Sequence, residues 1–321
     1  MTIARTGFKK GADMDQEGQT ITEGRALAEK LGRVGLWTRQ LDVQPAQQAR
    51  DAIAELEALG WGSLWFWEVF GREALTSAGL LLCASQRMVI ASGVANIWAR
   101  DPVAMTAAGR TLAEAYPGRF VLGIGVSHGP IVDARGHRYQ RPLDKMRGYL
   151  DAMDAAPWQG PPLAEEPPLV LAALGPRMLE LAAGRSAGAL LYNGTPEATA
   201  TARSVLGPGP LLAVEQAVLL EEDPAEARGI CREFMALYLT LPNYTGAWDR
   251  LGLGPEEQAE GGSDRMVDAV VAWGGPEVIT ERVRAHLDAG ADHVCIQVLD
   301  PDPNGLPMPS WRALAPALLE H

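Results

Sequence analysis

Residues 88–125 read MVIASGVANIWARDPVAMTAAGRTLAEAYPGRFVLGIG, and two apolar runs in this stretch flank a helical pattern. The runs at 88–94 and 120–125 are short and largely apolar, which is typical of strands buried on both faces of a parallel sheet. Pro102 suits the first turn of a helix, where no backbone N–H is needed, and Tyr116-Pro117-Gly118 ends that helix. The stretch therefore predicts two parallel strands joined by a helix.

The same alternation continues along the chain in both directions. Short apolar runs predict eight strands, at 34–37, 63–67, 88–94, 120–125, 169–174, 188–192, 211–220 and 293–299. Helices are expected at 45–59, 72–84, 102–115, 142–154, 176–183, 196–206, 224–240 and 276–289, and from Pro309 onward. Eight strand–helix units in 321 residues predict an α/β fold, a (β/α)8 TIM barrel. A doubly wound open sheet is the alternative, because periodicity does not reveal closure.

Three segments stand outside this alternation. Residues 1–30 lack sustained periodicity, so we interpret them as an N-terminal extension and assign the barrel domain to residues 31–321. Residues 126–141 follow the fourth predicted strand, and residues 243–274 separate two predicted helices. Insertions after strands lie on the C-terminal (active) face of a barrel. These two segments are expected to build substrate walls or a lid, with a solvated loop as the alternative for each.

The charge balance limits the class of partner. Lys and Arg number 28 against 40 Asp and Glu, and the resulting formal net charge of −12 disfavours a protein that coats nucleic acid or an anionic membrane. No apolar run reaches the roughly 18 residues of a membrane helix. The first thirty residues contain no apolar core typical of a secretory signal. These patterns predict a cytoplasmic protein.

Residue types that carry metal or Schiff-base chemistry are scarce. The three cysteines lie far apart and the histidines are not spaced as ligands, so we expect reduced thiols and no metal site (Cys83, Cys231, Cys295). Three of the four lysines lie within residues 1–30, and Lys145 falls in a predicted helix. An aldolase or pyridoxal enzyme needs a lysine inside its site, so both classes are disfavoured.

Two consecutive strand ends carry turns suited to an anion. Gly175 follows the fifth strand, Pro176 takes a first helical position, and Arg177 stands beside the free N–H groups. After the sixth strand, Asn193 and Gly194 precede Thr195, a natural helix cap. Cofactor-phosphate residues are therefore predicted at both turns (Leu174, Gly175, Pro176, Arg177, Met178, Asn193, Gly194 and Thr195). Ordinary strand–helix turns are the alternative.

The segment Ser92-Gly-Val-Ala-Asn-Ile-Trp-Ala-Arg-Asp-Pro102 resembles the third-strand signature of the bacterial-luciferase-like superfamily, especially its deazaflavin-dependent oxidoreductases. The resemblance continues through the first strand, the third helix and fourth strand, residues 172–182 and residues 289–294, in that order, and covers roughly residues 31–300. In this family a non-prolyl cis peptide forms a bulge behind the central ring of the cofactor. The matching bond here is Gly93–Val94.

The resemblance implies coenzyme F420 as the cofactor, with FMN as the alternative, and a homodimer. It places Gly93, Val94, Ala95 and Asn96 beside the ring. Gly125 is expected to let a ligand approach the fourth strand closely, and Trp37 is expected to wall the cofactor pocket, with a packed core tryptophan as the alternative. Three features depart from the usual pattern. The phosphate turns follow strands five and six rather than seven and eight; the lysines that some members direct at the phosphate are absent; and Trp67 is larger than its usual counterpart.

Two side chains are candidates for catalysis. Glu68 follows the second strand among aromatic residues, where burial would raise the pKa of its carboxyl and let it handle a proton. A carboxylate that caps a helix start is the alternative. His128 follows the fourth strand and is placed to donate to a developing oxyanion. An exposed loop histidine is the alternative.

The predicted function is F420-dependent hydride transfer between the deazaflavin C5 and a small organic substrate. An FMN-dependent luciferase-like monooxygenase is the first alternative, and a non-catalytic flavin- or deazaflavin-binding barrel is the second. A hydrolase with paired carboxylates is a third interpretation. It is disfavoured because no carboxylate except Asp300 stands at a strand end where it could pair with Glu68.

Overall fold

The computed structural model describes residues 16–319, and its centre is a closed barrel of eight parallel strands. β10 pairs with β1 on one side and with β8 on the other, so the sheet has no open edge at this junction. The (β/α)8 TIM barrel is confirmed, and the open doubly wound sheet is ruled out. The barrel strands are β1 (Val34–Thr38), β2 (Ser63–Phe66), β3 (Val89–Ser92), β5 (Phe120–Gly125), β6 (Leu169–Ala172), β7 (Gly188–Leu191), β8 (Leu211–Leu219) and β10 (His293–Val298).

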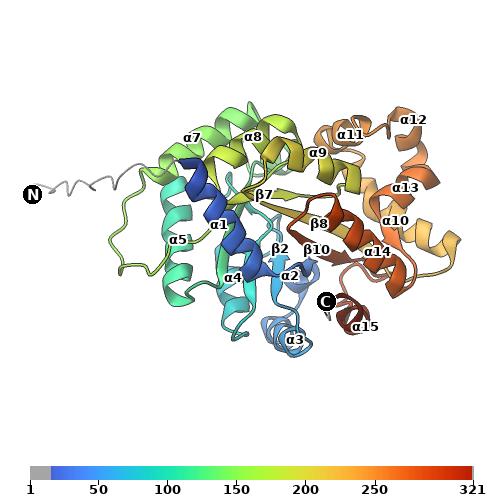
Figure 1. The fold of residues 1–321 in the computed structure, drawn as a ribbon, viewed down its shortest axis with the longest axis horizontal. Coiled ribbons are helices and arrows are strands. Elements are labelled where there is room, and N and C mark those ends of the chain that lie inside the picture. Colours follow the sequence, from blue (N-terminus) through green and yellow to red (C-terminus); the bar gives the residue numbers. More distant parts are fainter. Residues whose placement is uncertain (1–15, 320–321) are drawn as a thin grey trace, which may run out of the picture.

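A ring of helices surrounds the barrel (Figure 1). Proline occupies the first turn of several of these helices, and Asp101 and Thr195 cap two of them by accepting backbone N–H groups. Apolar residues on the helices pack against the outward side chains of the strands. The ring consists of α3 (Ala46–Ala58), α4 (Ala74–Leu82), α5 (Pro102–Ala115), α7 (Pro142–Asp154), α8 (Pro176–Arg185), α9 (Pro196–Leu206), α14 (Pro276–Asp288) and α15 (Met308–Leu319).

Part of the segment that we expected to be an irregular extension is a helix. α1 (Gln16–Leu31) runs across the molecule (Figure 1). Its Leu27 and Leu31 are buried with the side chains inside the barrel. A Cβ at Gly24 would overlap the backbone of residues 209–211, so helix and barrel approach closely there. The expectation of no regular element is therefore wrong for residues 16–30; residues 1–15 lie outside the described part of the chain.

The predicted helix at 224–240 exists, but it is not part of the ring. α10 (Pro224–Tyr238) belongs to a large insertion between β8 and α14, and α14 takes the ring position beside α9 and α15. The insertion is therefore wider than the predicted 243–274. It also contains α11 (Pro242–Asp249), α12 (Pro255–Gln258), η1 (Ala259–Gly261), α13 (Asp264–Val270) and β9 (Ala272–Trp273), and it gathers a separate apolar cluster over the end of β8 (Figure 1).

The third barrel strand is interrupted near its C-terminal end. β3 stops at Ser92, and the chain resumes as β4 (Ala95–Asn96), which pairs with the end of β5. The Gly93–Val94 peptide between them is cis, as the resemblance implied. A Cβ at Gly123 would overlap the carbonyl oxygen of Ser92, so glycine is required for the close approach of these strands. The break therefore lies at the active face of the barrel.

None of the helices in the described range 16–319 is long and apolar enough to cross a membrane.

Two histidines are held in their neutral form by burial. His293, at the start of β10, pairs Nδ1 with the Gly32 carbonyl at 2.6 Å and accepts from Trp65 Nε1 at 3.1 Å through Nε2. His286 on α14 contacts Thr199 Oγ1 at 2.8 Å and Gln216 Oε1 at 2.7 Å. Burial lowers the pKa of His286 to about 3 and that of His293 to about 4.

These pKa shifts predict a stability that falls in acid. The unfolded chain takes up protons at these histidines below pH 6.5 and the folded chain does not, so their contribution is present above pH 6.5 and lost as the pH falls. His286→Gln removes one of the two groups. The difference in unfolding free energy between wild type and this variant should narrow by about 2 kcal/mol between pH 6.5 and 5. Urea titrations at several pH values measure it, and a constant difference would contradict the prediction.

Candidate active site

A cavity of about 460 Å³ lies at the C-terminal ends of the barrel strands. Strand ends provide its floor, and both insertions provide its walls, through residues 126–142 and 237–244. The two insertions predicted to overlie the active face therefore both reach the cavity. The lining includes Trp37, Trp67, Glu68, Gly93, Val94, Asn96, Gly125, His128, Ile131, Tyr139, Leu174, Gly175, Met178, Tyr192, Tyr238, Leu241, Asn243 and Tyr244.

Most of the predicted site residues come together here. The ring residues Trp37, Gly93, Val94, Asn96 and Gly125 and both catalytic candidates line this cavity, as do three residues of the first turn (Leu174, Gly175, Met178). Pro176, Asn193 and Gly194 line a smaller cavity beside it.

Three predicted residues line neither cavity. Ala95 on β4 is fully buried in the apolar core between the barrel and the helices, and its side chain does not reach either cavity. Arg177 is exposed on the first turn of α8. Thr195 is a buried cap, whose hydroxyl accepts from Ala198 N and donates to Glu197. The contacts of Thr195 are those of the alternative interpretation, an ordinary strand–helix turn.

An aromatic hydrogen-bonded group forms the floor of the cavity. Trp37 Nε1 donates to the carbonyl of Gly93 at 3.1 Å, and its ring lies 5.1 Å from that of Tyr192. The hydroxyl of Tyr192 is 2.7 Å from that of Tyr238 and donates to Gln297 Oε1 at 2.7 Å. Burial raises the pKa of Tyr192 far above its ordinary value, so the phenol stays protonated. The floor is therefore rigid and uncharged.

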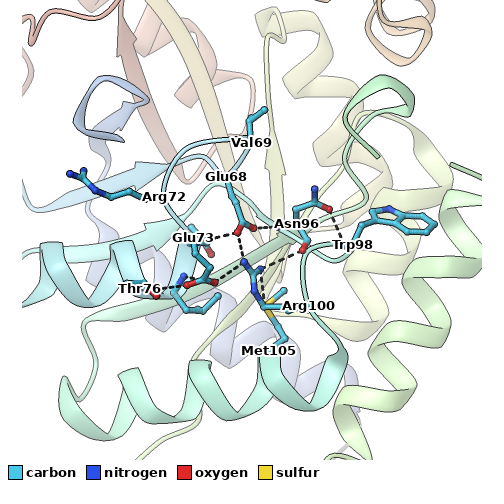
Figure 2. A network of polar contacts seen from close by, with 12 residues as sticks. Glu68, Val69, Arg72, Glu73, Thr76, Asn96, Trp98, Arg100 and Met105 are labelled. Carbon is cyan, nitrogen blue, oxygen red and sulfur yellow. Dashed lines mark hydrogen bonds and ion pairs between the residues drawn. The ribbon is translucent and has the colours of Figure 1, made fainter. Parts of the chain in front are cut away.

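Glu68 is bound to the backbone on both of its oxygens (Figure 2). One oxygen accepts from Asn96 N at 2.7 Å, and the other accepts from Ala74 N at 3.2 Å and pairs with Arg100. Arg100 also reaches the Asn96 carbonyl at 3.4 Å, and its guanidinium pairs with Glu73 at 2.6 Å. Glu68 and Arg100 therefore bind the backbone N–H and the backbone carbonyl of Asn96, just after the break in the third barrel strand. They fit a positioning role for Glu68 better than proton transfer.

This network leaves one amide donor free at the cavity wall. Oδ1 of Asn96 accepts from the backbone N–H of Trp98 at 3.0 Å, which fixes the orientation of the amide (Figure 2). Nδ2 of Asn96 is therefore turned the other way, and it is buried without a hydrogen-bond partner among the described residues. A buried, unpaired donor is unfavourable unless a ligand accepts from it. Asn96 is thus suited to a carbonyl or ring nitrogen of a bound molecule.

His128 lines the cavity after the end of β5, immediately before α6 (Gly129–Ala134). Its ring lies 5.4 Å from the ring of Tyr244, and its Nδ1 is buried with no hydrogen-bond partner in the described range. Burial lowers the pKa of His128, and the Asn243 side chain opposes this shift in part. The imidazole is therefore neutral at pH 7. The neutral ring can accept one proton and return it later.

The smaller cavity, of about 160 Å³, opens between the two predicted anion turns and α11. Arg250, at the end of α11, is its cation; the guanidinium donates to the Leu174 carbonyl at 3.0 Å. A Cβ added to Gly175 would meet nothing nearer than this guanidinium, at 3.9 Å. Gly175, Leu174, Tyr192 and Tyr244 line both cavities, so the two are neighbours.

Asn193 forms the wall of the smaller cavity with a left-handed backbone (φ 53°). Its N–H donates to Glu215 Oε2 at 2.9 Å, and its carbonyl accepts from Trp248 Nε1 at 3.1 Å. Burial raises the pKa of Glu215 to about 8, and the N–H of Asn193 opposes that shift. Both polar atoms of the Asn193 side chain lack a partner among the residues described. Glu215 and Trp248 therefore fix the backbone of this turn, and the side-chain amide of Asn193 remains available to bind a ligand.

Sequence reasoning missed the residues that the insertion contributes. Tyr238, Asn243 and Tyr244 complete the larger cavity, and Arg250 enters the smaller one. They lie far along the chain from every strand end, so no local pattern marks them. An available signal was the aromatic and polar sequence LYLTLPNYTGAW at 237–248, which is unusual for a surface loop.

The comparisons with known proteins agree with this geometry. The family model described as luciferase-like monooxygenase matches residues 27–293. A putative coenzyme F420-dependent oxidoreductase of Mycobacterium tuberculosis, Rv3520c, is 32% identical over 124 residues, which span 38% of this chain and 35% of that protein.

Two solved structures share the fold at low identity. The coenzyme F420-dependent tetrahydromethanopterin reductase from Methanopyrus kandleri has a TM-score of 0.71 at 16% identity, covering 89% of this chain and 99% of that one. The FMN-bound oxygenating constituent of 3,6-diketocamphane monooxygenase from Pseudomonas putida has a TM-score of 0.68 at 17% identity, covering 90% and 97%.

Proposed function

The chain belongs to the luciferase-like monooxygenase family, and from this premise we propose that it is an F420-dependent oxidoreductase that acts on a small organic substrate. The observation that carries the proposal is the pair of adjoining cavities at the barrel mouth. One has a volume of about 460 Å³ and is lined by the interrupted strand, and the other is lined by Arg250. The similarity to Rv3520c supports F420.

The residues that would hold the ring are those beside the interrupted strand. Val94 would back the ring, Trp37 would bound it, and Asn96 Nδ2 would donate to one of its polar atoms. A bound deazaflavin supplies a C5 that carries a hydride, and the protein supplies orientation and exclusion of water. The unpaired donor at Asn96 supports this fit, since it has no other acceptor in the described chain.

The phosphate end favours F420 over FMN on charge. The phosphate monoester of FMN carries about −1.5 to −2 at neutral pH, as other phosphate monoesters do, whereas the phosphodiester of F420 is a monoanion. Arg250 and the backbone N–H groups at the start of α8 would meet such a group, and the rest of the smaller cavity is mostly apolar. A single guanidinium balances a monoanion better than a dianion.

His128 would act on the substrate. Its imidazole is neutral at pH 7 and lines the cavity, so it can take a proton from a substrate hydroxyl, and the imidazolium that forms can return that proton to an alkoxide in the reverse reaction. Glu68 and Arg100 would keep Asn96 in place without touching the substrate. The insertions would close the site from water, because their residues form most of its outer wall.

Incubation with each cofactor followed by gel filtration tests the proposal. F420 should elute with the protein, and its visible absorbance should then bleach with an alcohol or return with a ketone. Retention of FMN, together with oxygen consumption after the flavin is reduced, would instead support a monooxygenase. This is the second candidate function, because the FMN-bound monooxygenase has a similar fold. Binding of F420 without turnover across alcohols, ketones, imines and activated alkenes would favour a storage or sensing role. The homodimer is part of the proposal, and light scattering measures it.

Arg250 and Arg177 give a matched pair for the phosphate end. Arg250→Ala should weaken F420 binding about tenfold, because one charge-assisted hydrogen bond to the phosphodiester is lost. Arg177→Ala should have a smaller effect, since Arg177 is exposed like Arg250 but lines neither cavity. Fluorescence titration with F420 measures both. A larger loss for Arg177→Ala would reinstate Arg177 as the phosphate cation and remove Arg250.

A further inference from the structure

The larger cavity contains almost no charge. No lysine or arginine of the described part of the chain lines it. Its acidic side chain is Glu68, whose carboxylate is 3% exposed and already paired with Arg100. Its remaining polar groups are hydroxyls, amides and the imidazole of His128.

The groups in this wall that can ionise are also held neutral. Burial raises the pKa of Tyr139, Tyr238 and Tyr244 above the ordinary value for a phenol. Burial lowers the pKa of His128. At pH 7 the lining of the cavity therefore offers a ligand hydrogen bonds but no unpaired charge; Arg39 lies behind this lining, 5.8 Å from the Trp67 ring.

This absence determines which substrates can enter. A carboxylate, phosphate or ammonium group moved from water into such a cavity loses its hydration and gains no ion pair, which is strongly unfavourable. A neutral molecule loses little and gains apolar contact with residues such as Ile131 and Leu241. One polar atom of such a molecule can pair with the free Nδ1 of His128.

We propose that the substrate is a neutral, largely apolar molecule with one oxygen function directed at His128, and that the cavity rejects its carboxylate, phosphate and ammonium analogues. The proposal rests on the proposed function, because it concerns the space left beside the cofactor ring. It adds the chemical class of the substrate, which the family does not supply.

Matched ligands on two skeletons test the proposal. The probes are 4-formylbenzamide, methyl 4-formylbenzoate and 4-formylbenzoate, and the cyclohexanone counterparts of all three. Binding is measured by tryptophan fluorescence, since Trp37 and Trp67 line the cavity. In both skeletons the amide and ester should bind at least about tenfold more tightly than the carboxylate, a difference of about 1.4 kcal/mol. Equal or tighter binding of the carboxylate, or no binding of either neutral probe up to its solubility, would overturn the proposal.

A charge placed in the wall provides the converse test. Ile131→Arg adds a guanidinium to the cavity from α6 and should shrink or reverse the preference for the amide by about tenfold. Val278→Arg adds the same charge at a site that is 46% exposed on α14 and should leave the preference unchanged. If Val278→Arg reduces the preference for the amide as much as Ile131→Arg does, the selectivity comes from the net charge of the protein and not from the cavity, and the proposal is wrong.

The titrations are run with and without F420, so that two failures can be distinguished. Loss of F420 binding with the neutral preference intact would remove the proposed cofactor and keep the selectivity of the cavity. F420 binding without the neutral preference would keep the function and overturn this inference.

Discussion

His128→Ala is expected to reduce turnover about 10²- to 10⁴-fold while leaving the affinity for F420 nearly unchanged. His128 lines the cavity, and its buried Nδ1 has no partner among the described residues. Its removal takes away the group that would exchange a proton with the substrate oxygen. The ring-holding residues on the strand ends remain. Steady-state kinetics and fluorescence titration with F420 separate the two effects.

The control for this variant is His137→Ala. His137 is an exposed histidine of the same insertion and does not line the cavity. Its removal should change turnover by less than about twofold, as for most surface substitutions. Comparable losses in both variants would mean that the insertion is disturbed as a whole, and undiminished turnover of His128→Ala would remove His128 from the mechanism.

The pH profile gives a second readout for His128. Burial lowers the pKa of this group below its ordinary 6.5, so its neutral form prevails from pH 7 down to that lowered value. Oxidation of an alcohol needs the neutral imidazole as proton acceptor, and kcat/KM should therefore fall only below pH 6.5. The acid limb should disappear in His128→Ala.

Gly175→Leu is expected to weaken F420 binding by about 10- to 100-fold, in line with the 1–3 kcal/mol typical of an overfilled site. Gly175 lines both cavities, and its φ of −137° is extended backbone that leucine also adopts. Within the protein, a Cβ there meets nothing nearer than Arg250 at 3.9 Å. The added side chain would therefore enter the space intended for the ligand, so the cofactor and not the fold is displaced.

Gly148→Leu is the matched control for this variant. Gly148 is exposed on α7, and a Cβ there meets no atom within 4 Å. It should leave F420 affinity unchanged. The unfolding midpoint of Gly175→Leu should stay within a few degrees of wild type, because the substitution at a helix cap costs about 1 kcal/mol. Unchanged affinity in a folded Gly175→Leu protein would place the phosphate elsewhere.

The barrel and its strand ends could be predicted because their signals are local. Each strand is a short apolar run, and prolines such as Pro102 and Pro276 mark helix starts within a few residues. The parallel arrangement then brings all C-terminal strand ends to one face, so Trp37, Asn96, His128 and Gly175 could be assigned to one site without knowledge of any contact.

Elements whose role depends on distant contacts could not be predicted. The pattern of α1 is weak, and it is fixed by Leu27 and Leu31 against the far end of the barrel. α10 has a clear helical pattern, but this pattern does not reveal that α14, and not α10, packs between α9 and α15 in the ring of helices around the barrel.

The amino-acid sequence by itself determined the order of strands and helices, the face on which the cavities lie and the glycines at their edges. The tertiary structure decided which polar groups are free. Glu68 is bound by Asn96 N and Arg100, and Asn96 Nδ2 and His128 Nδ1 lack partners in the described range. The reason is physical: burial and hydrogen bonding at a site are set by residues far away in the chain, such as Arg250 from the insertion, and no periodicity in the sequence encodes them.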